Sequence, residues 1–218
     1  MHKTINNFIS IKNEIESQSQ YKDRNINIIA VSKTFSIEHI KPLIDHGHNH
    51  FGENKVQETV EKWKTIKETN KNIKLHLVGK LQSNKVKFAI PIFDYIHSLD
   101  NTKLANKIHD EEKKINKKIK IFIQVNIDNE PQKSGIKKED LLDFYDYCFK
   151  DLNLDVVGLM CIPPNNISSS DYFKEMKNLN EKVKLQNLSM GMSSDYMEAI
   201  SNGANFVRIG TKIFGTRN

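Results

Sequence analysis

Short apolar runs alternate along the chain with longer segments whose apolar residues recur every three to four positions. The runs are rich in Ile, Val, Leu and Phe, a pattern typical of strands buried on both faces. We predict strands over 27–33, 48–52, 74–79, 95–99, 119–127, 154–162, 187–192 and 205–210. The periodic segments are typical of amphipathic helices. We predict helices over 4–19, 37–46, 56–68, 84–90, 102–116, 138–150, 170–185 and 195–201.

Residues that favour helix ends support several of these boundaries. Ser36 precedes the second helix, Asp100 or Asn101 the fifth, and Ser193 or Ser194 the last. Side chains of these types accept hydrogen bonds from the first free N–H groups of a helix. Pro42 falls inside the second helix, which we therefore expect to be short or kinked.

The regular alternation of strands and helices indicates the fold class. Strands that alternate with helices favour an α/β protein with a parallel sheet. Eight such units in 218 residues favour a closed (β/α)8 TIM barrel, with an extra N-terminal helix, in one domain over residues 1–218. An open doubly wound sheet is the alternative. No glycine-rich dinucleotide fingerprint follows a predicted strand, which weakens that alternative.

Composition and charge exclude some classes of protein. The formal net charge is +6, but no compact basic block with interleaved aromatic residues is present, so we do not expect nucleic-acid binding. Cys148 and Cys161 show neither metal-type spacing nor a disulfide framework, which fits a reducing cytoplasm. The first 19 residues do not resemble a signal peptide, and no apolar stretch reaches the ~20 residues that span a bilayer. We expect a cytoplasmic protein without membrane contact.

The first predicted strand ends on Lys33. A desolvated lysine has a lowered pKa and becomes a nucleophilic amine, as Schiff-base chemistry requires. The alternative is that Lys33 extends its ammonium group from the strand end into water. Position alone favours this second interpretation, because lysines are abundant in the chain.

Further polar or small residues lie at the carboxyl ends of predicted strands, where barrel enzymes carry their chemistry. Loops after the seventh and eighth strands commonly bind phosphate through backbone N–H groups. Met190 is interpreted as core or as lining of this site. The other candidates are Lys33, Asn54, Lys133, Ser193, Arg208, Gly210 and Thr211. The histidines at 46, 48 and 50 lack an accompanying carboxylate or cysteine cluster, so we do not interpret them as a metal site.

Seven segments together carry a resemblance to a known family. They are AVSKT (30–34), FGEN (51–54), LQSNK (81–85), KSG (133–135), GLM (158–160), LSMGMS (188–193) and VRIGT (207–211). Each segment alone is weak evidence for a relationship. Together the segments are specific, and the match extends over nearly the whole chain in one order. The chain resembles the pyridoxal phosphate homeostasis protein family, the single-domain relatives of the alanine racemase barrel domain.

The resemblance implies roles for the candidate residues. Lys33 would hold pyridoxal 5′-phosphate (PLP) as a Schiff base, and Ser193, Gly210 and Thr211 would cradle its phosphate. Arg208 would face the pyridine nitrogen or lie close to the phosphate. Asn54 would lie near the ring, Lys133 near the mouth, and Met190 beside them. Some relatives carry a second lysine two positions after the first, where this chain has Phe35.

The chemistry of these residues suggests a binding protein rather than a strong catalyst. If Arg208 faces the pyridine nitrogen, that nitrogen stays unprotonated, and the ring withdraws electrons less well. A racemase also needs a second acid or base on the opposite face of its substrate. The sequence ends shortly after the eighth strand, so we expect no added domain to supply one.

Our hypothesis is a monomeric protein that binds, protects and hands over PLP, with transient contact to apo-enzymes that use it. The rivals are a PLP-dependent amino-acid racemase, a Schiff-base aldolase without cofactor, and a nucleic-acid binder.

Overall fold

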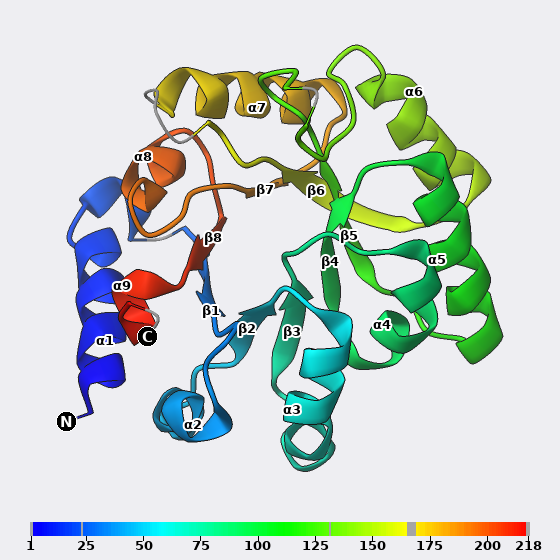
Figure 1. The fold of residues 1–218 in the computed structure, drawn as a ribbon. Coiled ribbons are helices and arrows are strands. Elements are labelled where there is room, and N and C mark those ends of the chain that lie inside the picture. The colour runs from blue at the N-terminus through cyan, green and yellow to red at the C-terminus, as the bar shows by residue number, and fades with distance from the viewer. Residues whose placement is uncertain (1, 23, 131, 165–168, 217–218) are drawn as a thin grey trace.

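The computed structural model describes residues 2–22, 24–130, 132–164 and 169–216. Eight parallel strands follow one another in chain order around a closed barrel, in which β8 pairs with β1. Figure 1 shows the strands at the centre and the helices outside them. The predicted barrel and N-terminal helix are confirmed. The strands are β1 (Asn27–Val31), β2 (His50–Glu53), β3 (Lys74–Leu77), β4 (Tyr95–Leu99), β5 (Lys120–Gln124), β6 (Asp155–Met160), β7 (Asn187–Ser189) and β8 (Phe206–Ile209).

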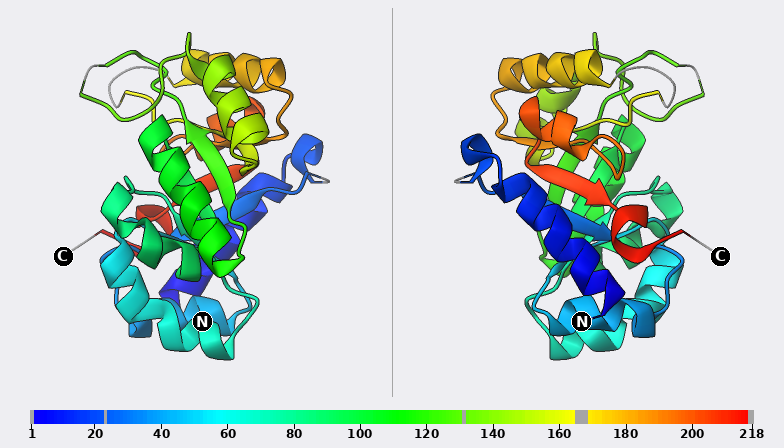
Figure 2. Two further views of the ribbon diagram at one scale, coloured as in Figure 1. Left: turned by 90° about the vertical axis from the view of Figure 1, so that its right-hand side faces the viewer. Right: turned by 90° about the vertical axis from the view of Figure 1, so that its left-hand side faces the viewer.

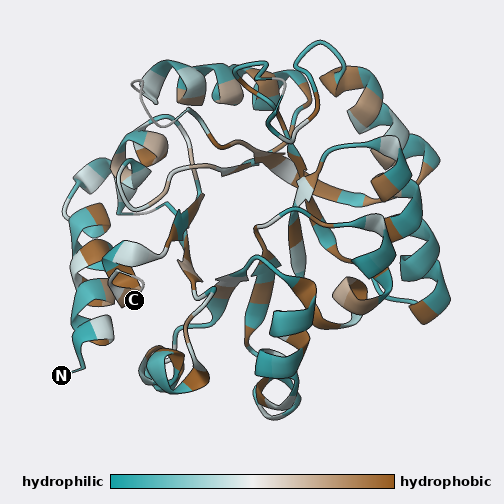
Figure 3. Ribbon diagram, in the orientation of Figure 1, coloured by the Kyte–Doolittle hydropathy of each residue, from teal (hydrophilic) through white to brown (hydrophobic). Residues whose placement is uncertain are grey.

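The strands are buried on both faces, as their apolar runs predict. A small inner cluster contains Ile29, Val31, Phe122, Met160 and Phe206, and a much larger cluster joins the strands to the helices. Phe122 of β5 contacts Phe206 of β8 with ring centroids 5.1 Å apart, although these strands are not neighbours. Their contact therefore crosses the barrel interior. Figure 3 shows polar and apolar residues on each outer helix, as expected for amphipathic helices between the sheet and water.

The first eight helices occupy the predicted segments with shifted boundaries, and α9 was not predicted. The helices are α1 (Lys3–Glu16), α2 (Ile37–Asp45), α3 (Val56–Thr69), α4 (Val86–Ile92), α5 (Thr102–Ile115), α6 (Leu141–Asp146), α7 (Ser170–Lys182), α8 (Tyr196–Ser201) and α9 (Thr211–Phe214). Short 3-10 turns cover Ser19–Tyr21 and Ser83–Lys85, and a π-helical turn, Tyr147–Asp151, follows α6.

Some local predictions were wrong. Most strands are shorter than predicted, because several apolar residues at their carboxyl ends belong to loops rather than to the sheet. Asp195, not Ser193 or Ser194, precedes α8. Asn101 caps α5, its side chain accepting from the backbone N–H of Leu104 at 2.9 Å. Pro42 lies inside α2, which is nine residues long.

The first and last helices pack against each other on the outside of the barrel. Figure 2 shows α1, in blue, crossing the barrel wall beside the red C-terminal segment. The side-chain amide of Asn7 donates to the carbonyl of Ile213 at 2.9 Å. Glu14 accepts from Tyr196 at 2.5 Å and from Lys212 at 3.0 Å. These contacts tie α1 to α8 and α9, next to the carboxyl end of β8. Within the described ranges, no helix combines the length and apolar character needed to cross a bilayer.

Candidate functional site

Lys33 and Gly210 lie at the same mouth of the barrel. Lys33 is two residues beyond the end of β1, and Gly210 directly follows β8, whose Ile209 is in register with Ala30. A Cβ atom built on Gly210 would lie 3.4 Å from the carbonyl oxygen of Val31. The ends of β1 and β8 are therefore in contact. The half-buried Lys33 lies in the turn after β1, next to the loop that is predicted to bind phosphate.

The turn that carries Lys33 has an unusual backbone held by one side chain. Thr34 has φ = 72°, a left-handed conformation that is rare for a β-branched residue. Such strain persists only where the surroundings over-determine it. The Lys62 ammonium donates to the carbonyls of Ser32 at 3.1 Å and Phe35 at 3.0 Å, one on each side of the strained residue.

Glu53 anchors this arrangement from the core. Its side chain is 1% exposed, and its Oε1 accepts from Ser32 Oγ at 2.8 Å, Lys62 Nζ at 2.8 Å and Trp63 Nε1 at 2.9 Å. A buried carboxylate is tolerated only when it is paired and hydrogen-bonded in this way. We define Glu53, Lys62 and Trp63 with Ser32 as the Glu53 cluster. The sequence analysis missed it, although Glu53 lies in the FGEN segment, because nothing in the sequence joins it to α3.

Arg208 projects into the barrel interior below this mouth, 5% exposed. Its Nη1 donates to the carbonyl oxygen of Ser189 at 2.6 Å and to Ser189 Oγ at 2.8 Å, and its Nη2 donates to the carbonyl of Cys161 at 2.9 Å. Burial lowers the pKa of Arg208, but a guanidinium stays protonated in proteins. Of its five N–H donors, Nε–H and one on Nη2 have no acceptor among the described residues. They are available to a ligand.

The loops after β7 and β8 bring three predicted phosphate-binding residues together. Ser193 Oγ accepts from the backbone N–H of Lys212 at 3.3 Å, which joins the two loops. The N–H of Thr211, at the start of α9, has no acceptor within the described part of the chain. Gly191, with φ = 88°, permits the first loop to turn, because a Cβ atom there would lie 2.5 Å from Ala199 Cβ. Ser193, Gly210 and Thr211 therefore border one small region.

Asn54 directly follows β2, and Lys133 lies in the loop after β5. Asn54 Oδ1 is buried without a hydrogen-bond partner in the described structure, and Asn54 packs tightly against Gly79 after β3. Lys133 pairs with Glu130 and borders a cavity of about 270 Å³ that Gly79 also lines. The structure therefore places both residues near Gly79. Met190 is fully buried in the larger apolar cluster.

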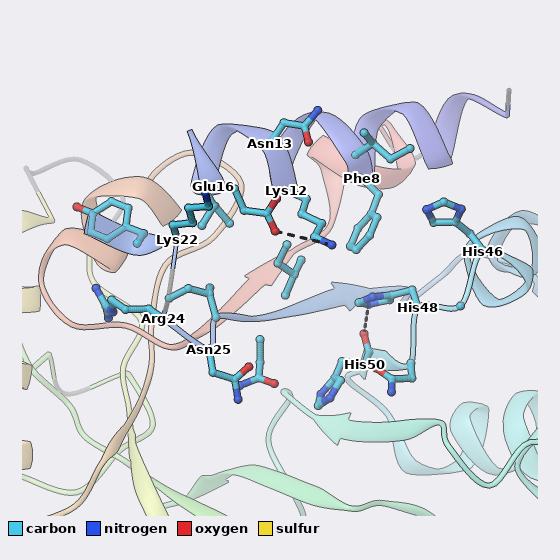
Figure 4. Close-up of a pocket in the computed structure, with 18 residues that line it drawn as sticks. Phe8, Lys12, Asn13, Glu16, Lys22, Arg24, Asn25, His46, His48 and His50 are labelled. Carbon is cyan, nitrogen blue, oxygen red and sulfur yellow. Dashed lines mark hydrogen bonds and ion pairs between the residues drawn. The ribbon is translucent and has the colours of Figure 1, made fainter. Parts of the chain in front are cut away.

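A larger cavity, of about 630 Å³, lies elsewhere, between α1 and the amino ends of β1 and β2. Figure 4 shows that α1 covers it on one side and that His46, His48 and His50 border it on another. None of the predicted site residues lines it. Burial lowers the pKa of His48 to about 4. Within the described ranges, no group of three or more His, Cys, Asp or Glu residues is arranged to hold a metal ion.

The residues at the mouth fit a phosphorylated aldehyde. A lysine amine can condense with an aldehyde. A hydroxyl, a glycine that allows close approach and a free N–H at a helix start suit a phosphate group. The unpartnered Asn54 oxygen and the two free Arg208 donors can bind polar atoms of an aromatic ring.

Comparison with known proteins shows the family to which the chain belongs. The family model described as "Alanine racemase, N-terminal domain" matches residues 9–218, which defines the class of barrel. The chain is 37% identical to the pyridoxal phosphate homeostasis protein of Haemophilus influenzae, over 95% of this chain and 93% of that protein. It is also 37% identical to the protein of that name from Aquifex aeolicus, over 87% and 86% of the two chains. The chain belongs to the pyridoxal phosphate homeostasis protein family.

Solved structures are similar over the same length. PipY of Synechococcus elongatus PCC7942, in a structure without PLP, is 29% identical, with a TM-score of 0.87 over 98% of this chain and 100% of that one. A second PipY structure, with PLP bound, gives the same TM-score over 97% and 100%. An alanine racemase from Clostridium difficile 630 is 16% identical, with a TM-score of 0.75 over 99% of this chain and 57% of that one. This last likeness shows the fold alone.

Proposed function

We propose that this protein holds PLP as a Schiff base on Lys33 and acts in intracellular PLP homeostasis as a carrier. The observation that carries the proposal is the position of Lys33 at the barrel mouth, where the end of β1 touches Gly210. The names of the relatives, and the PipY structure with PLP bound, support it. The chain works as one barrel domain, in the cytoplasm and as a monomer.

Each residue at the mouth has a role in this proposal. The cofactor supplies an aldehyde carbon that condenses with amines, and the turn around Thr34 presents Lys33 to it. Ser193, Gly210 and Thr211 bind the phosphate. Asn54 Oδ1, which has no partner among the described residues, hydrogen-bonds near the ring. Lys133 lies at the entrance, and Met190 contributes to the apolar cluster at the end of β7.

Arg208 favours holding PLP over using it as a strong electron sink. Its fixed charge and free donors suit the pyridine nitrogen, which then accepts a hydrogen bond and stays unprotonated. A ring in that state stabilises a carbanion less well. The proposed task is therefore to keep a reactive aldehyde bound and to transfer it to apo-enzymes by transient contact.

Titration of the purified protein with PLP tests this proposal. We expect a visible Schiff-base absorption band that saturates at one equivalent per chain. At 100 times the Kd, bound ligand adds about 2.7 kcal/mol to the free energy of unfolding, so the melting temperature should rise. The absence of both effects would contradict the proposal.

A racemisation assay on the loaded protein separates a carrier from a racemase. We expect no steady racemisation of alanine. Turnover within the usual enzyme range of about 1–10³ s⁻¹ would show that the protein is a racemase instead.

A further inference from the structure

Three histidines form a polar strip inside the barrel, beside apolar rings such as Phe122 and Phe206. His50, His76 and His97 come from the adjacent strands β2, β3 and β4. His50 Nδ1 lies 2.9 Å from His76 Nε2, and His76 Nδ1 lies 2.9 Å from His97 Nε2. His76 and His97 are fully buried. In each contact, Nδ1 of one ring faces Nε2 of the next, so the three rings form one hydrogen-bonded line.

The strip continues across the barrel to Arg208. His97 Nδ1 lies 2.8 Å from Ser189 Oγ, which accepts from Arg208 Nη1 at 2.8 Å. Ser189 belongs to β7, which is not a neighbour of β4, so this contact crosses the interior. We name His50, His76, His97, Ser189 and Arg208 the polar column. Arg208, at the end of the polar column, belongs to the proposed cofactor site.

The direction of every hydrogen bond in the polar column follows from Arg208. A guanidinium only donates, so Ser189 Oγ accepts from it. The single Ser189 hydroxyl proton is then satisfied by donation to His97 Nδ1. His97 therefore carries its proton on Nε2 and donates to His76 Nδ1, and His76 donates through Nε2 to His50 Nδ1. Burial lowers the pKa of all three histidines, which agrees with neutral rings.

Aromatic stacking fixes the rings of the column. His97 stacks on Phe122, with centroids 4.3 Å apart and planes 16° apart. His76 stacks on Tyr95, with centroids 4.3 Å apart and planes 9° apart. At the other end, His50 borders the large cavity shown in Figure 4. The column is therefore anchored by stacking in the middle and reaches the edge of the barrel at His50.

We propose that His97 and Ser189, supported by His76 and His50, are positioning residues that fix the guanidinium of Arg208. With both Nη1 hydrogens committed to Ser189 and one Nη2 hydrogen to Cys161, the group cannot rotate. Its Nε–H and remaining Nη2–H then have set directions. The positioning role rests on the proposed function in one respect, which is that Arg208 binds PLP. The fixing of Arg208 itself requires no cofactor.

Two substitutions at position 97 separate positioning from mere packing. His97→Phe removes both hydrogen bonds of the ring and keeps an aromatic ring against Phe122. His97→Asn keeps an acceptor, Oδ1, in place of Nδ1 toward Ser189, and loses the contact to His76 and the stacking on Phe122. Ser189→Ala, which removes the shared hydroxyl, is a second test if His97→Phe does not fold.

The first readout is NMR of the cofactor-free protein labelled with ¹⁵N at arginine and histidine. In the wild type and in His97→Asn, we expect separate, slowly exchanging Nη–H signals for Arg208. We expect Nε2–H tautomers for the three wild-type rings. In His97→Phe and Ser189→Ala, the Nη signals should merge through rotation. Unchanged Arg208 signals in these two variants would overturn the proposal, as would Nδ1–H tautomers in the wild type.

The second readout is the affinity for PLP, measured by the same titration as above. In His97→Phe, Ser189 Oγ loses the partner that orients it toward Arg208, and loss of its hydrogen bond to the guanidinium is expected to weaken PLP binding about tenfold. His97→Asn should bind like the wild type. Equal weakening in both variants would overturn the positioning role. A wild-type protein that fails to bind PLP, yet shows the expected Arg208 signals, would refute the proposed function and leave the positioning intact.

Discussion

The Lys33→Ala variant is expected to fold like the wild type and to lose the visible Schiff-base band completely. Lys33 is half-buried on a turn whose backbone carbonyls accept from Lys62, which is itself paired with Glu53. These contacts remain in Lys33→Ala, so the turn and the fold should persist. The phosphate-binding loops remain, so weak non-covalent binding should persist. Absorbance titration and thermal unfolding measure the two effects.

The matched control is Lys33→Arg, which keeps a positive charge at the mouth but cannot form a Schiff base. It should also lack the band. If the band persists in either variant, another amine holds the cofactor. Lys133, which borders the mouth and pairs with Glu130, would then be the first residue to examine.

The second large effect, a loss of folding stability, is expected for Glu53→Leu. Lys62 is 14% exposed on its side chain, and Glu53 is its carboxylate partner. Removing one member of a buried ion pair typically costs about 3–5 kcal/mol, because the remaining charge stays buried without compensation. We expect a loss of that order in the free energy of unfolding, measured in urea. Affinity for PLP should fall as well, because the turn around Thr34 loses part of its support.

The double variant Glu53→Leu/Lys62→Met separates the loss of folding stability from the loss of affinity for PLP. It leaves no unpaired charge, so it should regain much of the lost stability. It should not regain affinity for PLP, because nothing then donates to the carbonyls of Ser32 and Phe35 from position 62. Recovery of both properties in the double variant would show that the Glu53 cluster stabilises the fold without shaping the Lys33 turn.

The order of the strands and the location of the mouth follow from the sequence for clear reasons. Apolar runs such as that of β5 are buried on both faces because helices surround the barrel. In a closed parallel barrel, all strand ends meet at one mouth. Lys33, Ser193, Gly210 and Thr211 therefore had to come close once the strands were assigned. Strand length was less predictable, because apolar residues such as Ile127 and Met190 continue into loops that are themselves buried.

The Glu53 cluster and the polar column depend on contacts that no local pattern encodes. Glu53 reaches Trp63 one helix later, and His97 reaches Ser189 across the barrel. Before the strands are placed, His50, His76 and His97 look like isolated histidines on separate strands. A usable signal is present in retrospect. His76 is in register with Gly52 and Tyr95, which lie two residues from His50 and His97, and side chains two residues apart on a strand share one face.

Reduction of the PLP-loaded protein with borohydride, followed by peptide mapping, tests the central claim most directly. Borohydride converts a Schiff base into a stable amine, which marks the lysine that formed it. We expect one phosphopyridoxyl group per chain, on the peptide that contains Lys33. A label on any other lysine, or no label after reduction of a saturated sample, would contradict the account.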